Sequence, residues 1–99
     1  MKPEYILCAA IHYPDETTQF ALPINIAQGV VICGHRHHNC IATYKALTNK
    51  KTGANNPQGF LTNKNRFVDR VEGRTIALAA GQITNDTYHE KELFSEDLY

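Results

Sequence analysis

The fold is decided by the stretch QGFLTNKNRFVDRVEGRTIALAAG, residues 58–81. Its first five residues predict a short strand, the turn formers that follow reverse the chain, and the next residues lead into a helix. Asp69, with Glu72 three residues later, matches a capping box in which Glu72 reaches back to the first free amide. Gly81 is placed to end the helix after about Ala80, because glycine tolerates the left-handed conformation. The stretch therefore predicts a strand followed closely by a capped helix.

Two more strands are predicted upstream of this stretch. Residues 5–13 are nearly all apolar and end at Pro14, which predicts a strand buried on both faces. Residues 29–34 are rich in β-branched side chains and flanked by glycines, which predicts another strand. Residues 20–26 are apolar but contain Pro23, so we expect a loop or an edge segment between these strands.

A further helix should follow the strand at 29–34. Asn39 is its expected N-cap, and three apolar residues fall at helical spacing after it: Ile41, Tyr44 and Leu47. Residues 48–57 are rich in turn formers and predict a polar loop. The tail, residues 93–99, is too apolar to remain in solvent, so we expect it to dock on the body or on a partner.

These elements predict one small α/β (α+β) domain over residues 1–99, with an antiparallel or mixed sheet, two main helices and an oligomeric state. A chain of 99 residues suits a single domain and excludes a large multi-domain enzyme or a TIM barrel. No apolar run approaches the roughly 18 residues of a membrane span, and no secretory leader is expected. Three cysteines are too few for a disulfide scaffold, which indicates a reducing cytosol.

The net charge of zero hides a strong asymmetry along the chain. Residues 33–75 hold eight basic side chains against two acidic ones, whereas residues 76–99 hold five acidic side chains against one basic one. A basic middle can attract a small polyanion while the acidic end keeps the protein from coating nucleic acid. The alternative is that the acidic tail packs against the basic face, in the same chain or in a neighbouring copy.

Residues 33–40, CGHRHHNC, are the most unusual segment. Zinc accepts their ligand types, but structural zinc sites usually bring two ligand pairs from separate places, and no second pair is found. The segment joins a strand to a helix start, where free amides and the helix dipole favour phosphate. Arginine can hold phosphate with two parallel hydrogen bonds, and histidines can donate hydrogen bonds or stack on a base. The candidate ligand residues are His35, Arg36, His37, His38 and Asn39.

A more conservative interpretation exists for the same segment. Cys33 and Cys40 would be core residues, and one or two of the histidines would bond backbone groups. We prefer this interpretation for the cysteines and the anion site for Arg36.

Residues 66–70, RFVDR, place two arginines around an aromatic at the mouth of the other predicted helix. Phe67 could stack a nucleobase, a contact worth about 1–3 kcal/mol, and either arginine could reach phosphate. In the alternative interpretation, Phe67 belongs to the core, Asp69 only caps the helix, and the arginines lie on a solvated face. We prefer this alternative for Phe67 and Asp69. The candidate ligand residues are Arg66, Phe67, Asp69 and Arg70.

Four motifs in combination resemble the Thoeris anti-defence type-one family of small bacteriophage proteins: GxRHHNCI at 34–41, QGFLT and RFVDR at 58–70, IAxAAGQ at 76–82, and LFSEDLY at 93–99. The resemblance implies an α/β fold and dimers or larger oligomers. It also implies a sponge, which binds cyclic ADP-ribose isomers or cyclic di- and trinucleotides and releases them unbroken.

The resemblance carries over to Arg36, His37 and His38, to residues 66–70, and more loosely to residues 95–97. It departs at residues 14–28, which are longer and more apolar than the family pattern.

We therefore expect a protein of the host bacterial cytoplasm that sequesters a cyclic nucleotide or cyclic ADP-ribose signal without cleaving it. The expected partners are that signal and further copies of the chain, with no membrane and no DNA or RNA polymer. No enzyme activity, cofactor or metal is expected. One alternative is a small metal- or histidine-dependent phosphodiesterase that degrades such signals. The other is an inhibitor that binds a host defence factor through the acidic tail.

Overall fold

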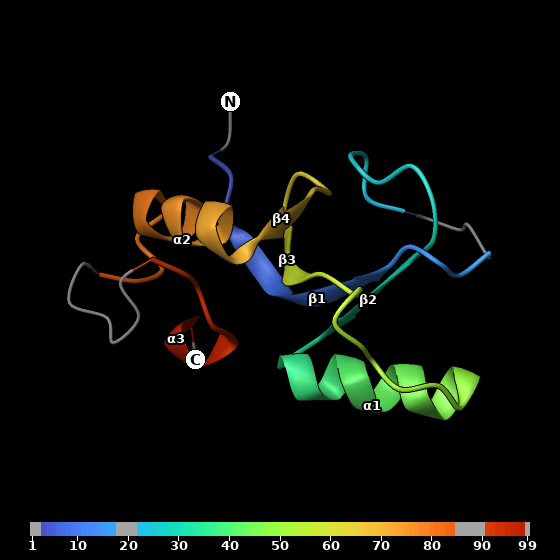
Figure 1. Cartoon of the computed structure of the whole chain (residues 1–99). Helices are drawn as coiled ribbons and strands as arrows, with labels where there is room; N and C mark the ends of the chain where they lie inside the picture. The colour runs from blue at the N-terminus through green and yellow to red at the C-terminus, as the bar shows by residue number, and fades with distance from the viewer. Residues whose placement is uncertain (1–2, 18–21, 85–90, 99) are drawn as a thin grey trace.

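The computed structural model describes residues 3–17, 22–84 and 91–98. Within them, four strands form one antiparallel sheet in the order β2-β1-β3-β4, and three helices surround it (Figure 1). This confirms the α+β class with two main helices, whereas the oligomeric state stays a prediction. The elements are β1 (Ile6–Tyr13), β2 (Val30–Gly34), α1 (His37–Thr48), β3 (Gln58–Thr62), β4 (Phe67–Asp69), α2 (Arg70–Ala79) and α3 (Ser95–Leu98).

The central strand β1 carries an irregularity that serves the core. Ile6 pairs with Thr62 but Cys8 already pairs with Leu61, so β1 has one residue more than β3 over this step, as in a β-bulge. The extra residue shifts the alternation of side chains, and Ile6 and Ala9 are therefore both buried. Most of β1 is buried as expected, but Leu7, its second residue, is 47% exposed.

The core lies where the two main helices meet the sheet. Helix α1 packs against β1 and β2, and α2 packs against β3 and β4. The Phe60 ring on β3 is fully buried between them, with the His37 ring edge-on at 5.2 Å. A Cβ atom at Gly73 of α2 would lie 3.1 Å from Phe60 Cδ2. The glycine that weakens the first turns of α2 thus lets the helix approach the ring.

The segment before β2 follows the open edge of the sheet. Asn25 accepts a hydrogen bond from the Phe67 amide at 2.8 Å and donates one to the Phe67 carbonyl at 2.6 Å. The Ile24 amide donates to the Asn65 carbonyl at 2.8 Å. These bonds cover the edge of β4, which would otherwise offer free backbone groups to another strand. Residues 22–26 are a loop, as expected; residues 20 and 21 lie outside the described part.

Of the two main helices, α2 starts at the cap residue that the sequence indicates, and α1 does not. Asp69 caps α2 as predicted, since its Oδ1 accepts from the Glu72 amide at 2.8 Å, but the Glu72 carboxylate lies on Arg66 instead of completing the box. Asn39 is not the N-cap of α1. The helix begins at His37, and Asn39 accepts from the Arg36 amide at 2.9 Å from its third position. A side chain inside the first turn can reach this amide just as a side chain that precedes the helix can.

The buried stripe of α1 also differs from the expected one. It consists of His37, Cys40 and Tyr44, whereas Ile41 is 37% exposed and Leu47 is 75% exposed. Helical spacing relates both sets of residues to Tyr44, so only the packing of α1 against the sheet decides which set is buried.

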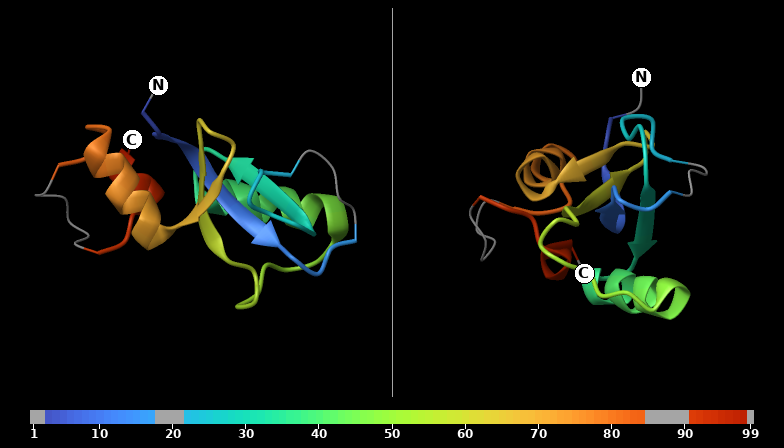
Figure 2. Two further views of the ribbon diagram at one scale, coloured as in Figure 1. Left: turned by 90° about the horizontal axis from the view of Figure 1, so that it is seen from above. Right: turned by 45° about the vertical axis from the view of Figure 1, so that its right-hand side comes forward.

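The tail docks on the body, as predicted. Leu93 is fully buried, and its amide donates to the Arg70 carbonyl at 2.8 Å. The short helix α3 follows and lies below α2, on the side of the molecule where α1 lies (Figure 1 and Figure 2, right). The acidic tail thereby meets the start of α2 within the same chain.

The start of the chain is joined to α2 by a charged network. Glu4 accepts from Arg66 Nε and Nη2, both at 2.8 Å, and from Thr62 Oγ1 at 2.7 Å. Arg66 also lies 3.0 Å from Glu72. The Arg66 hydrogen bonds hold the pKa of Glu4 at about 2, below its ordinary value of 4.5.

Replacing Glu4 by glutamine should therefore lower the free energy of unfolding at pH 7 by about 1–2 kcal/mol. A lowered carboxyl pKa stabilises the native state above pH 4.5, and this contribution is lost as the pH falls towards 2. Urea unfolding of both proteins at several pH values measures the difference, which should vanish near pH 2. A constant difference from pH 7 to pH 2 would contradict the assignment.

Candidate functional site

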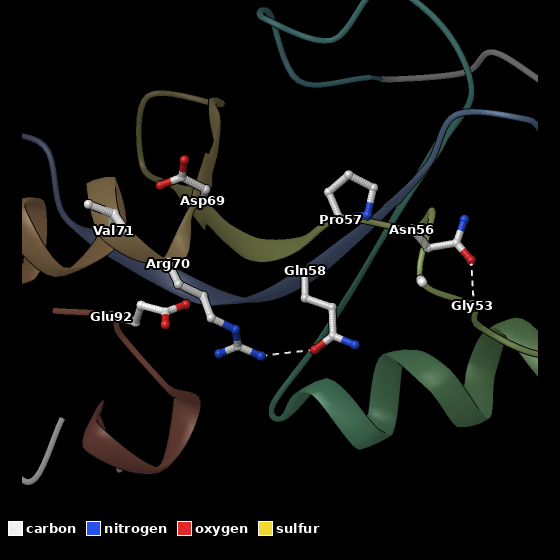
Figure 3. A pocket seen from close by; sticks show the side chains of 9 residues that line it. Gly53, Asn56, Pro57, Gln58, Asp69, Arg70, Val71 and Glu92 are labelled. Atoms are coloured by element: carbon white, nitrogen blue, oxygen red, sulfur yellow. Dashed lines mark hydrogen bonds between the residues drawn. The ribbon is translucent and has the colours of Figure 1, made fainter.

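A cleft lies between the start of α2, the loop before β3 and the chain that leads to α3. Its volume is about 470 Å³, within the 300–1,000 Å³ range of small-molecule sites. Figure 3 shows Arg70 and Gln58 meeting within it, with Asn56 and Pro57 on one side and Glu92 on the other. The cleft is lined by Gly53, Ala54, Asn56, Pro57, Gln58, Asp69, Arg70, Val71 and Glu92.

Arg70 is the cation of this cleft. Its Nη1 donates to the Leu93 carbonyl and its Nη2 to Gln58 Oε1, both at 2.9 Å. The guanidinium carbon lies 4.4 Å from the centre of the Phe94 ring, a cation–π contact. Burial lowers the pKa of Arg70 below its usual range, but a guanidinium stays charged at neutral pH. These contacts hold a positive charge in one orientation at the start of α2.

The structure separates the two arginines of the RFVDR segment. Arg70 lines the cleft, whereas Arg66 pairs with Glu4 and Glu72 in the network described above. Phe67 is half-buried beside His12, with 5.9 Å between ring centres. Asp69 lines the cleft and caps α2 at once.

The residues at the start of α1 do not line this cleft. His37 is buried, and its Nε2 lies 2.8 Å from the Gly59 carbonyl oxygen, to which it donates in the matching tautomer. Burial lowers the pKa of His37, so its ring is neutral at pH 7. This is the backbone-bonding role that the conservative interpretation predicts. His35 and His38 are exposed and Arg36 is half-buried at the helix start.

Comparison with protein-family models matches residues 5–99 to the family described as Phage T4 y16D protein. The chain belongs to the phage T4 y16D protein family. No curated protein and no solved structure matches the chain. Membership of this family supports the expected phage origin, and the match extends over both helix starts, the cleft and the docked tail.

Several residues that line the cleft of this phage T4 y16D family member were not predicted from the sequence. Asn56 and Gln58 were assigned to a polar loop and to a strand, and Glu92 to no element. The signal that points to them is the turn-rich run TGANNPQG at 52–59, which leads directly into a strand whose partner precedes Arg70. Loops that a rigid sheet positions often carry binding residues.

A second cavity, of about 260 Å³, lies on the other side of the same loop. The Tyr13 and Tyr44 rings stack there with 3.7 Å between centres. Tyr44 donates to Glu16 at 2.7 Å, and Lys50 donates to the same carboxylate oxygen at 2.8 Å. Because the rings stack on each other and the charges pair internally, this smaller cavity offers less to a ligand than the cleft beside Arg70.

The cysteines only partly follow the expected core role. Cys40 is fully buried, with its thiol 3.7 Å from the Ala9 carbonyl oxygen, but Cys33 is exposed. The expectation for Cys33 was wrong because β2 is an edge strand. A hydrogen bond from the Cys33 thiol, with help from the Gly34 amide, lowers the pKa of Cys8 to about 7.

The described residues contain no grouping of three or more His, Cys, Asp or Glu side chains that could hold a metal ion. In the same part of the chain, every helix is too short or too polar to cross a membrane.

Proposed function

We propose that the protein sequesters a cyclic nucleotide signal, a cyclic ADP-ribose isomer or a cyclic di- or trinucleotide, in the cleft beside Arg70. The proposal includes non-covalent binding without cleavage, in the cytoplasm of the bacterial host. It is supported by the phage family and by the sequence motifs that lead to both helix starts.

The observation that carries the proposal is the oriented Arg70 guanidinium in a cleft of nucleotide size. Its hydrogen bonds to Leu93 and Gln58 use two of the five N–H donors of a guanidinium. A phosphate that approaches the remaining donors would also lie near the start of α2, where free amides and the helix dipole favour negative charge. A site that sequesters such a ligand needs no reacting group, since tight binding alone removes the signal.

Sequestration is tested by incubating the purified protein with cyclic dinucleotides, cyclic trinucleotides and cyclic ADP-ribose isomers. Ligand in the ultrafiltrate is measured by chromatography before and after heat denaturation of the protein. We expect one class of ligand to disappear from the filtrate and to return intact on heating. Saturation at a hundredfold excess over the dissociation constant should add about 2.7 kcal/mol to the stability of the fold.

Two outcomes contradict the proposal. Ligand that returns cleaved would show an enzyme, such as the phosphodiesterase alternative. If no ligand disappears, the nucleotide function is wrong. The protein-inhibitor alternative then predicts that truncation before Leu93 abolishes binding to a host factor.

A further inference from the structure

One wall of the cleft carries two carboxamides whose oxygens are already hydrogen-bonded within the protein. Asn56 and Gln58 are half-buried carboxamides in this wall. The Gly53 amide donates to Asn56 Oδ1 at 2.8 Å, and Arg70 Nη2 donates to Gln58 Oε1 at 2.9 Å (Figure 3). Each carboxamide oxygen therefore already has a partner within the protein.

These bonds also fix which end of each carboxamide is turned outward. A backbone amide and a guanidinium are donors without acceptor capacity. They can face only the oxygen end of a carboxamide, because an NH2 group in that place would leave two donors facing each other. The NH2 groups of Asn56 and Gln58 are consequently the ends available to a ligand.

The opposite part of the cleft has the reverse character. Asp69 and Glu92 are carboxylates, which accept hydrogen bonds and cannot donate them when ionised. Asp69 Oδ1 already accepts from the Glu72 amide, and Glu92 is exposed. Donors and acceptors thus stand on different sides of one cavity, with Arg70 between them.

We propose that Asn56 and Gln58 determine the specificity of the cleft, by donating from their NH2 groups to phosphate or base acceptor atoms of a nucleotide. The Asp69 and Glu92 carboxylates would accept from ribose hydroxyls, a pairing that acidic side chains make in dinucleotide sites. This inference rests on the proposed function and adds the residues that read the ligand. A cleft of this kind disfavours a ligand that lacks acceptors opposite Gln58, because the half-buried NH2 group would then be shielded from water without a partner.

The inference is tested with Asn56→Asp and Gln58→Glu. Each variant keeps an oxygen for Gly53 or Arg70, so the internal bond survives, but the outward NH2 group becomes an oxygen. The matched control is Asn55→Asp, which adds the same charge to the same loop at a residue that does not line the cleft. Affinity for the nucleotide found in the depletion experiment is measured by equilibrium dialysis.

We expect each of the two variants to bind at least about tenfold more weakly than the control. The side-chain NH2 signals of Asn56 and Gln58 in the wild-type ¹⁵N spectrum should also shift on addition of the nucleotide. If the wild type binds and the variants bind equally well, the inference fails while the proposed function stands. If no nucleotide in the panel binds to the wild type, both fail.

Discussion

Replacing Phe60 by alanine should produce the largest loss of stability, about 3–5 kcal/mol. The ring is fully buried on β3, contacts the His37 ring and faces Gly73 of α2. Its removal leaves a cavity that neither main helix can fill without leaving the sheet. Small domains have a total stability of about 5–15 kcal/mol, so the variant should be largely or partly unfolded at 37 °C.

Urea unfolding, followed by far-UV circular dichroism, measures this loss. Phe67→Ala is the matched control, since it removes the same ring from a half-buried position on the neighbouring strand. Phe67→Ala should lower the free energy of unfolding by about 1–2 kcal/mol, because folding buries less apolar area at this position. Equal losses in the two variants would show that the core does not centre on Phe60.

Replacing Arg70 by alanine should weaken nucleotide binding by about 100-fold. Hydrogen bonds to charged groups contribute about 1.5–3 kcal/mol, and Arg70 is the only arginine that lines the cleft among the residues the structure describes. The variant also loses the bond that orients Gln58 and the one to the Leu93 carbonyl. Arg70→Lys keeps the charge without the planar fork and should bind with intermediate affinity.

The control for Arg70→Ala is Lys64→Ala, which removes one positive charge from the exposed turn between β3 and β4. Its affinity should stay within about twofold of the wild type, because exposed charges at a distance are screened by salt. Isothermal titration calorimetry gives the affinities, and urea unfolding shows that each variant is folded. Should Arg70→Ala bind normally while Arg36→Ala does not, the ligand site lies at α1 instead.

The local signals in the sequence predicted the three longer strands and the two main helices, but not the short β4 and α3. Asp69 and Glu72 are three residues apart, so the bond that starts α2 depends only on neighbouring residues. Gly81 ends α2 with a φ of 75°, for the same local reason. The α+β class followed from these elements, because short strands with close connections pair in antiparallel fashion. The N-cap of α1 was predicted three positions too late, at Asn39 instead of Arg36, since more than one position near a helix start can bond its free amides.

The candidate site was predicted in part. Arg70 and Asp69 do line the cleft, but His37 belongs to the core and Arg66 to an ion-pair network. Nothing local in a run of polar residues indicates that His37 is buried, because its burial depends on its contacts with Gly59 and Phe60 of β3. The residues at 53–58 were described as a loop and a strand because their role appears only when Arg70 is next to them.

Arg66 and Arg70 show most clearly what the sequence determines and what the tertiary structure decides. They flank the same three residues and share the same chemistry, so the sequence by itself determined that two guanidinium groups stand at the start of a capped helix. Only the tertiary structure decided that Arg66 meets Glu4, 62 positions away, while Arg70 meets Gln58 and the Leu93 carbonyl. Hydrogen bonds between neighbours are set by local spacing, whereas the partner of a long side chain depends on which distant segments the folded core brings to it.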